Sequence, residues 1–148
     1  MYMIKLYLVR HGETDGNSQQ WFQGASDVPL NATGIEQARR LSRFMKDIHF
    51  DAIYTSTLSR AYTTAKIIAE PHQLPVQQYP ELREISFGVW ERHTYDEITK
   101  QWPGEIEAFY ASEGKMRARA VNRSSKCGTV LRPRRKSYLV TMQTGIPL

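Results

Sequence analysis

The chain has 148 residues, of which 41% are hydrophobic and 24% charged, a composition typical of one ordinary globular domain. No apolar run reaches the roughly 18 residues of a membrane-spanning helix, the N-terminus lacks a signal-peptide pattern, and the single cysteine excludes an internal disulfide. We therefore expect a cytoplasmic protein with no membrane partner.

The net charge of +5 combines two parts of opposite sign. Residues 1–114 hold 11 Lys and Arg against 15 Asp and Glu, a charge of −4. Residues 115–148 hold 9 Lys and Arg and no acidic residue, a charge of +9. This asymmetry divides the chain into a domain over 1–114 and a basic tail over 115–148.

Apolar runs and amphipathic stretches alternate along the first part of the chain. Strands are predicted over 5–9, 51–55 and 76–79, and helices over 34–46 (capped by Thr33), 59–69, 95–102 and 106–110. Residues 13–30 are expected to form a long loop. This alternation predicts an α/β fold with a mainly parallel sheet and crossover helices.

Polar turns follow the first two predicted strands, at Arg10–Gly12 and at Ser56–Ser59. Ligands of parallel sheets bind beyond the carboxyl ends of the strands, so these turns and Arg60 should share one rim. Neutral imidazole is a nucleophile near pH 7, and a neighbouring arginine can bind phosphate oxygens in a fork. His11 is therefore a candidate phosphoryl acceptor, although the triplet Arg-His-Gly alone is a weak signal.

Further motifs accompany this triplet in a fixed order. They are Leu8–Thr14, Gln23–Gly24, Pro29–Leu30, Ser56–Ala61, Leu82–Glu84 and Phe87–Glu91. Together they resemble the histidine phosphatase superfamily, which includes cofactor-dependent phosphoglycerate mutases and many phosphomonoesterases. The resemblance covers roughly residues 4–114 and implies a phosphoglycerate mutase-like fold.

The resemblance also implies a set of site residues. His11 would become phosphohistidine, the two arginines would hold phosphate oxygens, and Glu84 would exchange a proton with the leaving and attacking oxygens. The implied catalytic residues are His11, Glu84, Arg10 and Arg60, and the implied substrate-binding residues are Arg10, Asn17, Gln23, Gly24, Arg60 and Glu84. Since arginine and histidine supply the positive charge, we expect no metal and no cofactor.

The family pattern includes a second catalytic histidine at the end of a later strand, and here the chain departs from it. None of its four histidines lies after His93, which is not that residue. We therefore expect the C-terminal part of the fold to be missing or aberrant, an apolar sheet edge beside the first strand to be unpaired, and activity to be weak or absent.

Three explanations remain open for residues 115–148. They could be a native tail that binds nucleic acid or anionic membrane, the product of a natural loss of the second half, or out-of-frame translation after a frameshift near residue 114. We favour the frameshift, with a poorly ordered tail, because the acidic residues vanish abruptly.

The function that the sequence favours is phosphomonoester hydrolysis through phosphohistidine, acting on a small phosphorylated metabolite. Phosphoglycerate mutase is one alternative, because the two activities would share every residue named above. A non-catalytic remnant that binds a phosphorylated ligand is another. Only the basic tail hints at nucleic acid, and the sequence leaves the oligomeric state open.

Overall fold

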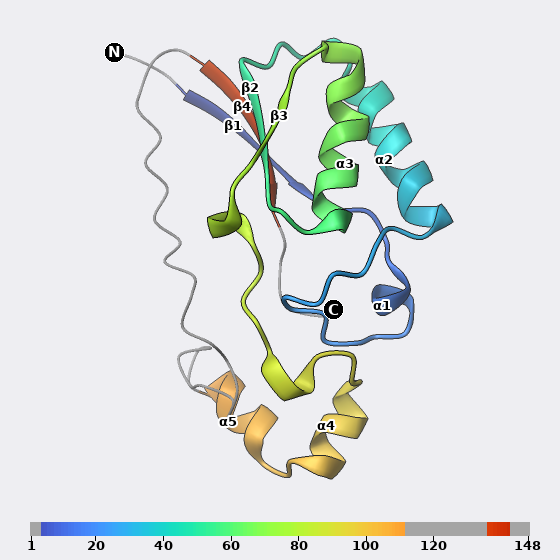
Figure 1. Ribbon diagram of the computed structural model, residues 1–148, viewed down its shortest axis with the longest axis vertical. Coiled ribbons are helices and arrows are strands. Elements are labelled where there is room, and N and C mark those ends of the chain that lie inside the picture. Colours follow the sequence, from blue (N-terminus) through green and yellow to red (C-terminus); the bar gives the residue numbers. More distant parts are fainter. Residues whose placement is uncertain (1–3, 112–135, 143–148) are drawn as a thin grey trace.

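The computed structural model describes residues 4–111 and 136–142 and contains one sheet of four strands (Figure 1). All three strand pairings are parallel, and the spatial order is β1-β4-β2-β3. The strands are β1 (Ile4–Arg10), β2 (Ala52–Thr55), β3 (Val76–Gln78) and β4 (Lys136–Met142). The predicted α/β fold with a parallel sheet is confirmed.

Four of the helices fall close to the predicted ranges, but residues 15–18, inside the expected loop 13–30, form a one-turn helix that was not predicted and that is held by a capping box at Thr14. The helices are α1 (Asp15–Ser18), α2 (Ala32–Met45), α3 (Ser59–Ala69), α4 (Tyr95–Gln101) and α5 (Glu105–Ala111), with single 3-10 turns η1 (Glu70–His72), η2 (Pro80–Leu82) and η3 (Gly88–Trp90). The predicted cap of α2 was wrong: Asn31, not Thr33, precedes the helix, and its side chain accepts a hydrogen bond from Gly34 N at 2.9 Å. No helix within the described residues could span a membrane.

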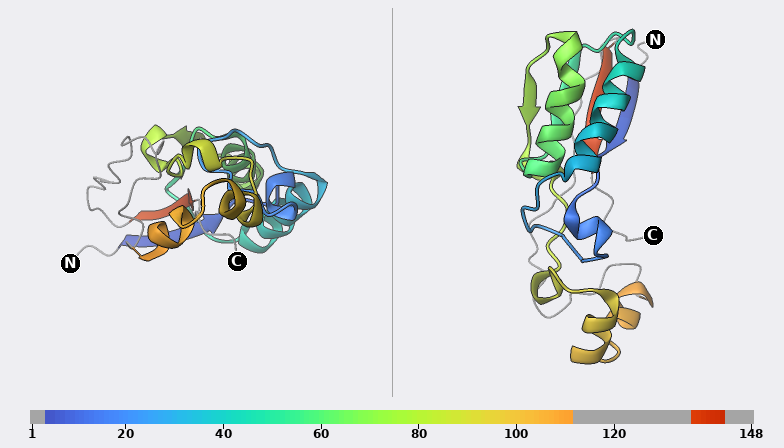
Figure 2. Two further views of the ribbon diagram at one scale, coloured as in Figure 1. Left: turned by 90° about the horizontal axis from the view of Figure 1, so that it is seen from below. Right: turned by 90° about the vertical axis from the view of Figure 1, so that its right-hand side faces the viewer.

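Helices α2 and α3 both lie on the same face of the sheet (Figures 1 and 2). Their apolar stripes pack with the inward residues of β1 and β2 into one core, which includes Val9, Met45, Ile53 and Ile68. A β-α-β connection between parallel strands is normally right-handed. Strands β1, β2 and β3 follow one another in the same direction across the sheet. Right-handed connections between them therefore place both crossover helices on one face.

A second apolar cluster lies beyond the carboxyl ends of the strands, around α4, α5 and η3 (Figure 1). Its buried members are Phe22, Phe87, Trp90, Ile98 and Ile106. Phe22 belongs to the long loop after β1, so this cluster fixes the far side of that loop. The rim that carries His11 consequently lies between two packed cores.

Strand β4 was not predicted, because residues 115–148 showed no clear strand pattern. It lies between β1 and β2, with Arg10 opposite Met142 and Thr55 opposite Thr141. The expectation that β1 would lack a neighbour was therefore wrong on this side. On its other side β1 borders no described strand, and Leu6 and Leu8 are 48% and 59% exposed. The rest of the tail lies outside the described residues, and its origin stays a prediction.

Candidate active site

His11 directly follows β1 and is buried, with 8% of its surface exposed. Its Nδ1 lies 2.6 Å from the carbonyl oxygen of Gly12. Because a carbonyl oxygen only accepts hydrogen bonds, Nδ1 carries the proton and the lone pair lies on Nε2. Burial, together with the charges of Arg60 and Arg10, lowers the pKa of His11 to about 4 despite the opposing effect of the Gly12 hydrogen bond. The imidazole is therefore neutral at pH 7.

The turn after β1 is held by helix α3. The backbone N–H of Gly12 donates to Oγ1 of Thr64 at 3.1 Å, and the same hydroxyl donates to the carbonyl oxygen of Arg60 at 2.8 Å. Thr64 is 1% exposed. One threonine thus joins the backbone beside His11 to the helical turn that carries Arg60, which confirms the shared rim.

Arg60 and Glu84 form a buried ion pair at this rim. Nη2 of Arg60 donates to Oε2 of Glu84 at 3.2 Å, and their side chains are 0% and 9% exposed. Burial raises the pKa of Glu84, although Arg60 and Arg10 oppose the rise. Burial also lowers the pKa of Arg60, and the charge of Glu84 counteracts it. Glu84 is therefore a carboxyl group that keeps its proton to a higher pH than usual, as a proton donor requires.

Arg10 is the last residue of β1, and its side chain is exposed. Its charge lowers the pKa of both His11 and Glu84, so Arg10 lies near His11 and near the buried Arg60–Glu84 pair. The four residues predicted to be catalytic are thus brought together by three separate elements. Their phosphate-binding and proton-transfer roles stay predictions.

Asn17 and Gln23 make contacts within the long loop. Asn17 Oδ1 accepts from Thr14 N at 3.0 Å, and the Thr14 hydroxyl caps α1 by accepting from Asn17 N at 3.2 Å. Gln23 is 7% exposed, and its Oε1 lies 2.8 Å from the Thr14 hydroxyl. These bonds shape the loop beside the site, while the predicted contacts of both residues with substrate stay predictions.

Gly24 has a left-handed backbone, with φ of +51°, and its carbonyl oxygen accepts from Arg60 at 2.8 Å.

Three contributors were not predicted from the sequence. Glu91 stood inside a quoted motif segment without a role, Thr64 stood in the helix predicted over 59–69, and Asp27 stood in the expected loop without a role. The Asp27 carboxylate accepts from Ser59 N at 2.7 Å, so it occupies the start of α3.

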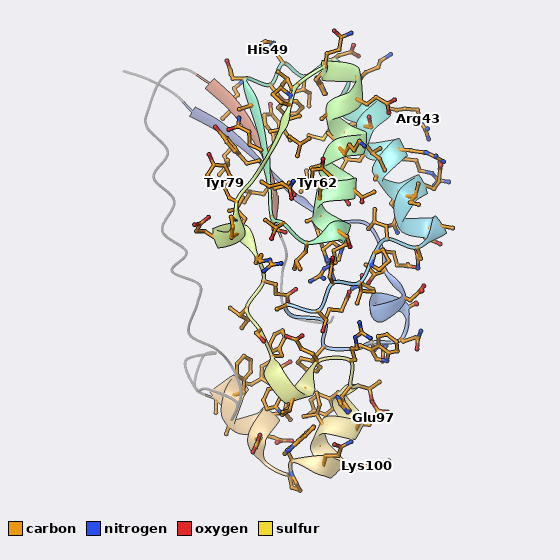
Figure 3. All side chains as sticks on the ribbon, in the orientation of Figure 1. Arg43, His49, Tyr62, Tyr79, Glu97 and Lys100 are labelled. Atoms are coloured by element: carbon orange, nitrogen blue, oxygen red, sulfur yellow. The ribbon has the colours of Figure 1, made fainter. Side chains whose placement is uncertain are left out.

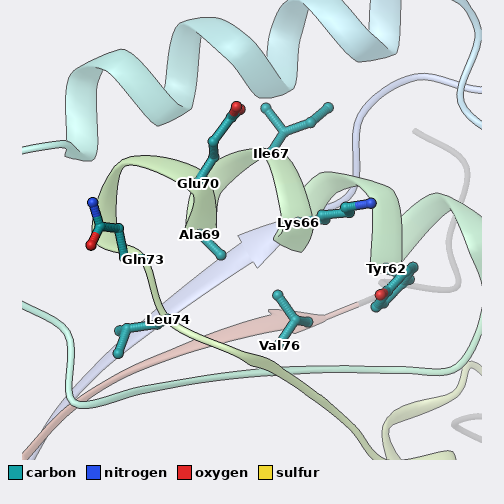
Figure 4. Close-up of a pocket in the computed structure, with 8 residues that line it drawn as sticks. All are labelled: Tyr62, Lys66, Ile67, Ala69, Glu70, Gln73, Leu74 and Val76. Carbon is teal, nitrogen blue, oxygen red and sulfur yellow. The ribbon is translucent and has the colours of Figure 1, made fainter.

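Other features lie apart from this constellation. His49 is at the end of the sheet away from His11 (Figure 3), and a groove of about 450 Å³ lies between α3 and β3, lined in part by Tyr62, Lys66 and Val76 (Figure 4). None of the predicted site residues lines that groove. Among the described residues, no three His, Cys, Asp or Glu side chains gather in a way that could hold a metal ion.

The sequence pattern of the histidine phosphatase superfamily, branch 1, matches residues 6–131. The chain belongs to this superfamily. The match confirms the resemblance and extends it past the boundary expected near residue 114.

Relatives within the superfamily match the first part of the chain closely. The chain is 46% identical over 104 residues to the uncharacterized phosphatase PhoE of Bacillus subtilis (strain 168), covering 70% of this chain and 54% of PhoE. It is 45% identical over 94 residues to the adenosylcobalamin/alpha-ribazole phosphatase of Escherichia coli (strain K12), covering 63% of this chain and 46% of that protein. The chain therefore spans about half the length of these relatives.

The fold also matches solved structures of the superfamily. The structure of Bacillus stearothermophilus YhfR superimposes with a TM-score of 0.75 at 29% identity, covering 95% of this chain and 74% of YhfR. This coverage is wider than that of the curated relatives. The histidine phosphatase fold is therefore retained beyond the region of high sequence identity.

Proposed function

We propose that the chain transfers phosphoryl groups through His11, with hydrolysis of a small phosphomonoester as the reaction. The observation that carries the proposal is the state of His11. It is buried and neutral, its Nδ1–H is bound to the Gly12 carbonyl, and its unprotonated Nε2 belongs to a rim that also holds two arginines and a carboxyl group of raised pKa. The names of the phosphatase relatives support the same class of substrate.

The reaction would proceed in two steps. Nε2 of His11 attacks phosphorus, the bond from phosphorus to the ester oxygen breaks, and Glu84 gives its proton to that leaving oxygen. Water then attacks the phosphohistidine, Glu84 takes back a proton, and inorganic phosphate leaves as the bond to Nε2 breaks. The charges of Arg60 and Arg10 stabilise the transferring group in both steps.

We further propose that turnover is weak. No histidine follows His93 within these 148 residues, so this stretch of chain offers no counterpart of the second catalytic histidine of the family pattern. Loss of one electrostatic stabiliser of a transition state typically costs about a hundred- to a thousandfold in rate. A turnover rate equal to that of full-length relatives would contradict this expectation.

The test is hydrolysis of an aryl phosphate by the wild-type chain and by His11→Ala, with quenching in alkaline detergent to trap phosphoenzyme. The exposed His49→Ala variant is the matched control, because it also removes a histidine from the folded chain. We expect phosphate release and acid-labile phosphoenzyme in the wild type and in His49→Ala, and neither in His11→Ala. Release that survives in His11→Ala would refute the proposal.

The same preparations distinguish the alternatives. Interconversion of phosphoglycerates that exceeds their hydrolysis would favour a mutase. Binding of inorganic phosphate by a folded wild-type chain without phosphoenzyme would instead indicate a non-catalytic binding protein.

A further inference from the structure

Glu91 joins two loop segments, residues 24–26 and 86–87, that lie beside the candidate site residues Arg60 and Glu84. Its carboxylate accepts hydrogen bonds from one backbone N–H and one hydroxyl of each segment. The four donors are Ala25 N at 3.0 Å, Ser26 Oγ at 2.5 Å, Ser86 Oγ at 2.9 Å and Phe87 N at 3.0 Å. So many bonds to one carboxylate make a strong, directional connection.

The first of these segments, residues 24–26, also binds the side chain of Arg60. The guanidinium group donates to the carbonyl oxygens of Gly24 at 2.8 Å and Ser26 at 2.7 Å, on either side of Ala25, whose N–H donates to Glu91. A Cβ atom on Gly24 would lie 2.6 Å from Oε1 of Glu91, so the carboxylate packs directly against this backbone. The position of Glu91 therefore sets the position of the acceptors that orient Arg60.

The second segment follows Glu84 closely in the chain. Ser86 lies two residues after Glu84, and its hydroxyl is bound to Glu91. Only Ile85 separates the two residues, so a bond at Ser86 restricts the backbone beside Glu84. Glu91 consequently holds the backbone that presents Glu84 to Arg60.

The charge of Glu91 reinforces this geometry. Burial alone would raise the pKa of Glu91, but the four hydrogen bonds lower it below its ordinary value, so the group is a carboxylate at neutral pH. Its charge raises the pKa of Arg60 and of Glu84. The charged groups that act on Glu84 are thus Arg60 and Arg10, which favour the carboxylate, and Glu91, which favours the acid.

We propose that Glu91 is a positioning residue that fastens segment 24–26 to segment 86–87 and so fixes Arg60 against Glu84. The inference rests on the proposed function, in which this pair faces the transferred phosphoryl group. Glu91 acts through Arg60 and Glu84.

The experiment compares two substitutions of Glu91 with a matched control. Glu91→Gln removes the charge but keeps a side chain of similar shape, and Glu91→Ala removes the connection. Glu97→Gln is the control, because Glu97 also accepts from a backbone N–H and a hydroxyl but lies exposed on α4 (Figure 3). The carboxyl carbon of Glu84 is followed by NMR through a pH titration, with Glu84→Gln identifying its signal.

We expect Glu91→Gln to shift the Glu84 titration to lower pH, because a like charge is removed, and Glu97→Gln to leave it unchanged. We expect Glu91→Ala to weaken binding of inorganic phosphate about tenfold and to lower kcat about a hundredfold wherever turnover is measurable. A purely structural role would leave the Glu84 titration of Glu91→Gln unchanged.

The inference is overturned if Glu84 titrates alike in the wild type and Glu91→Gln, or if folded Glu91→Ala binds phosphate as the wild type does. If Glu91→Ala does not fold, the titration of Glu84 in Glu91→Gln still tests the proposed role of Glu91. Failure of the proposed function is recognised separately, by phosphate release that persists in His11→Ala, and it does not affect the titration.

Discussion

The backbones of Gly12 and Gly34 are in direct contact, since a Cβ atom on Gly12 would lie 2.3 Å from the carbonyl oxygen of Gly34. A Cβ on Gly34 would in turn lie 2.1 Å from the carbonyl oxygen of Glu13. The first turn of α2 therefore packs against the turn that carries His11 with no room for a side chain at either position. The two glycines allow the turn beside His11 to lie directly against α2.

Gly34→Ala should destabilise the protein even though Gly34 lies inside a helix. Alanine in place of a helical glycine normally gains about 1 kcal/mol, but here the added methyl group must displace backbone, which costs about 1–3 kcal/mol. Urea denaturation measures the difference, and Thr33→Ala, at an exposed position of the same helix, is the control. A gain in stability for Gly34→Ala would contradict the packing described above.

Arg60→Met should be strongly destabilising because it removes the cation that faces the buried Glu84 carboxylate. Loss of one partner of a buried ion pair costs about 3–5 kcal/mol, and the Gly24 and Ser26 carbonyls lose their donors as well. Glu84→Gln should cost less, because the Gly24 and Ser26 carbonyls still accept hydrogen bonds from the Arg60 cation that it leaves without a carboxylate. Denaturant unfolding at pH 7 compares the two variants.

The control for this comparison is an exposed ion pair of the same length. Arg40 and Glu36 are also 3.2 Å apart, but their side chains are 75% and 44% exposed. Solvent screens such a pair, so Arg40→Met should leave stability almost unchanged. Similar losses in Arg60→Met and Arg40→Met would mean that burial of the Arg60–Glu84 pair has no energetic consequence.

Thr64→Val should destabilise the protein by about 1–3 kcal/mol, because the buried N–H of Gly12 loses its acceptor. Valine has nearly the same shape, so the loss reports on the hydroxyl rather than on packing. Thr64→Ser keeps the hydroxyl and serves as the control. We expect Thr64→Val, but not Thr64→Ser, to speed amide exchange at Gly12, and equal exchange in both variants would argue against this bond.

Stability should fall in mild acid because His11 binds a proton less readily when folded. Its pKa is about 4 in the folded chain, against 6.5 ordinarily. The unfolded chain therefore takes up a proton first as the pH drops below 6.5, and the free energy of unfolding decreases, by about 3 kcal/mol at pH 4 from this group alone. Unfolding free energies from pH 8 to pH 4 test this, with His11→Asn showing the shallower decline. Parallel profiles for the two proteins would contradict the assignment.

The sequence by itself predicted strands β1, β2 and β3, helices α2 and α3 and the rim at the carboxyl ends of the strands. The family resemblance then nominated His11, Arg10, Arg60 and Glu84 as site residues. Strands such as β1 and helices such as α2 follow from local periodicity. The rim follows because parallel strands all end at one edge. The motif order was sufficient to indicate the superfamily to which the chain belongs.

Only the tertiary structure decided which groups complete the site. The insertion of β4 between β1 and β2 depends on pairing with residues more than eighty positions away, and a short run in a basic segment carries no local sign of it. Glu91 likewise serves distant loops, and its partners become neighbours only after folding. The proton on Nδ1 of His11 and the depressed pKa of that residue follow from burial and from the Gly12 carbonyl, which are properties of the folded environment and not of the residue type.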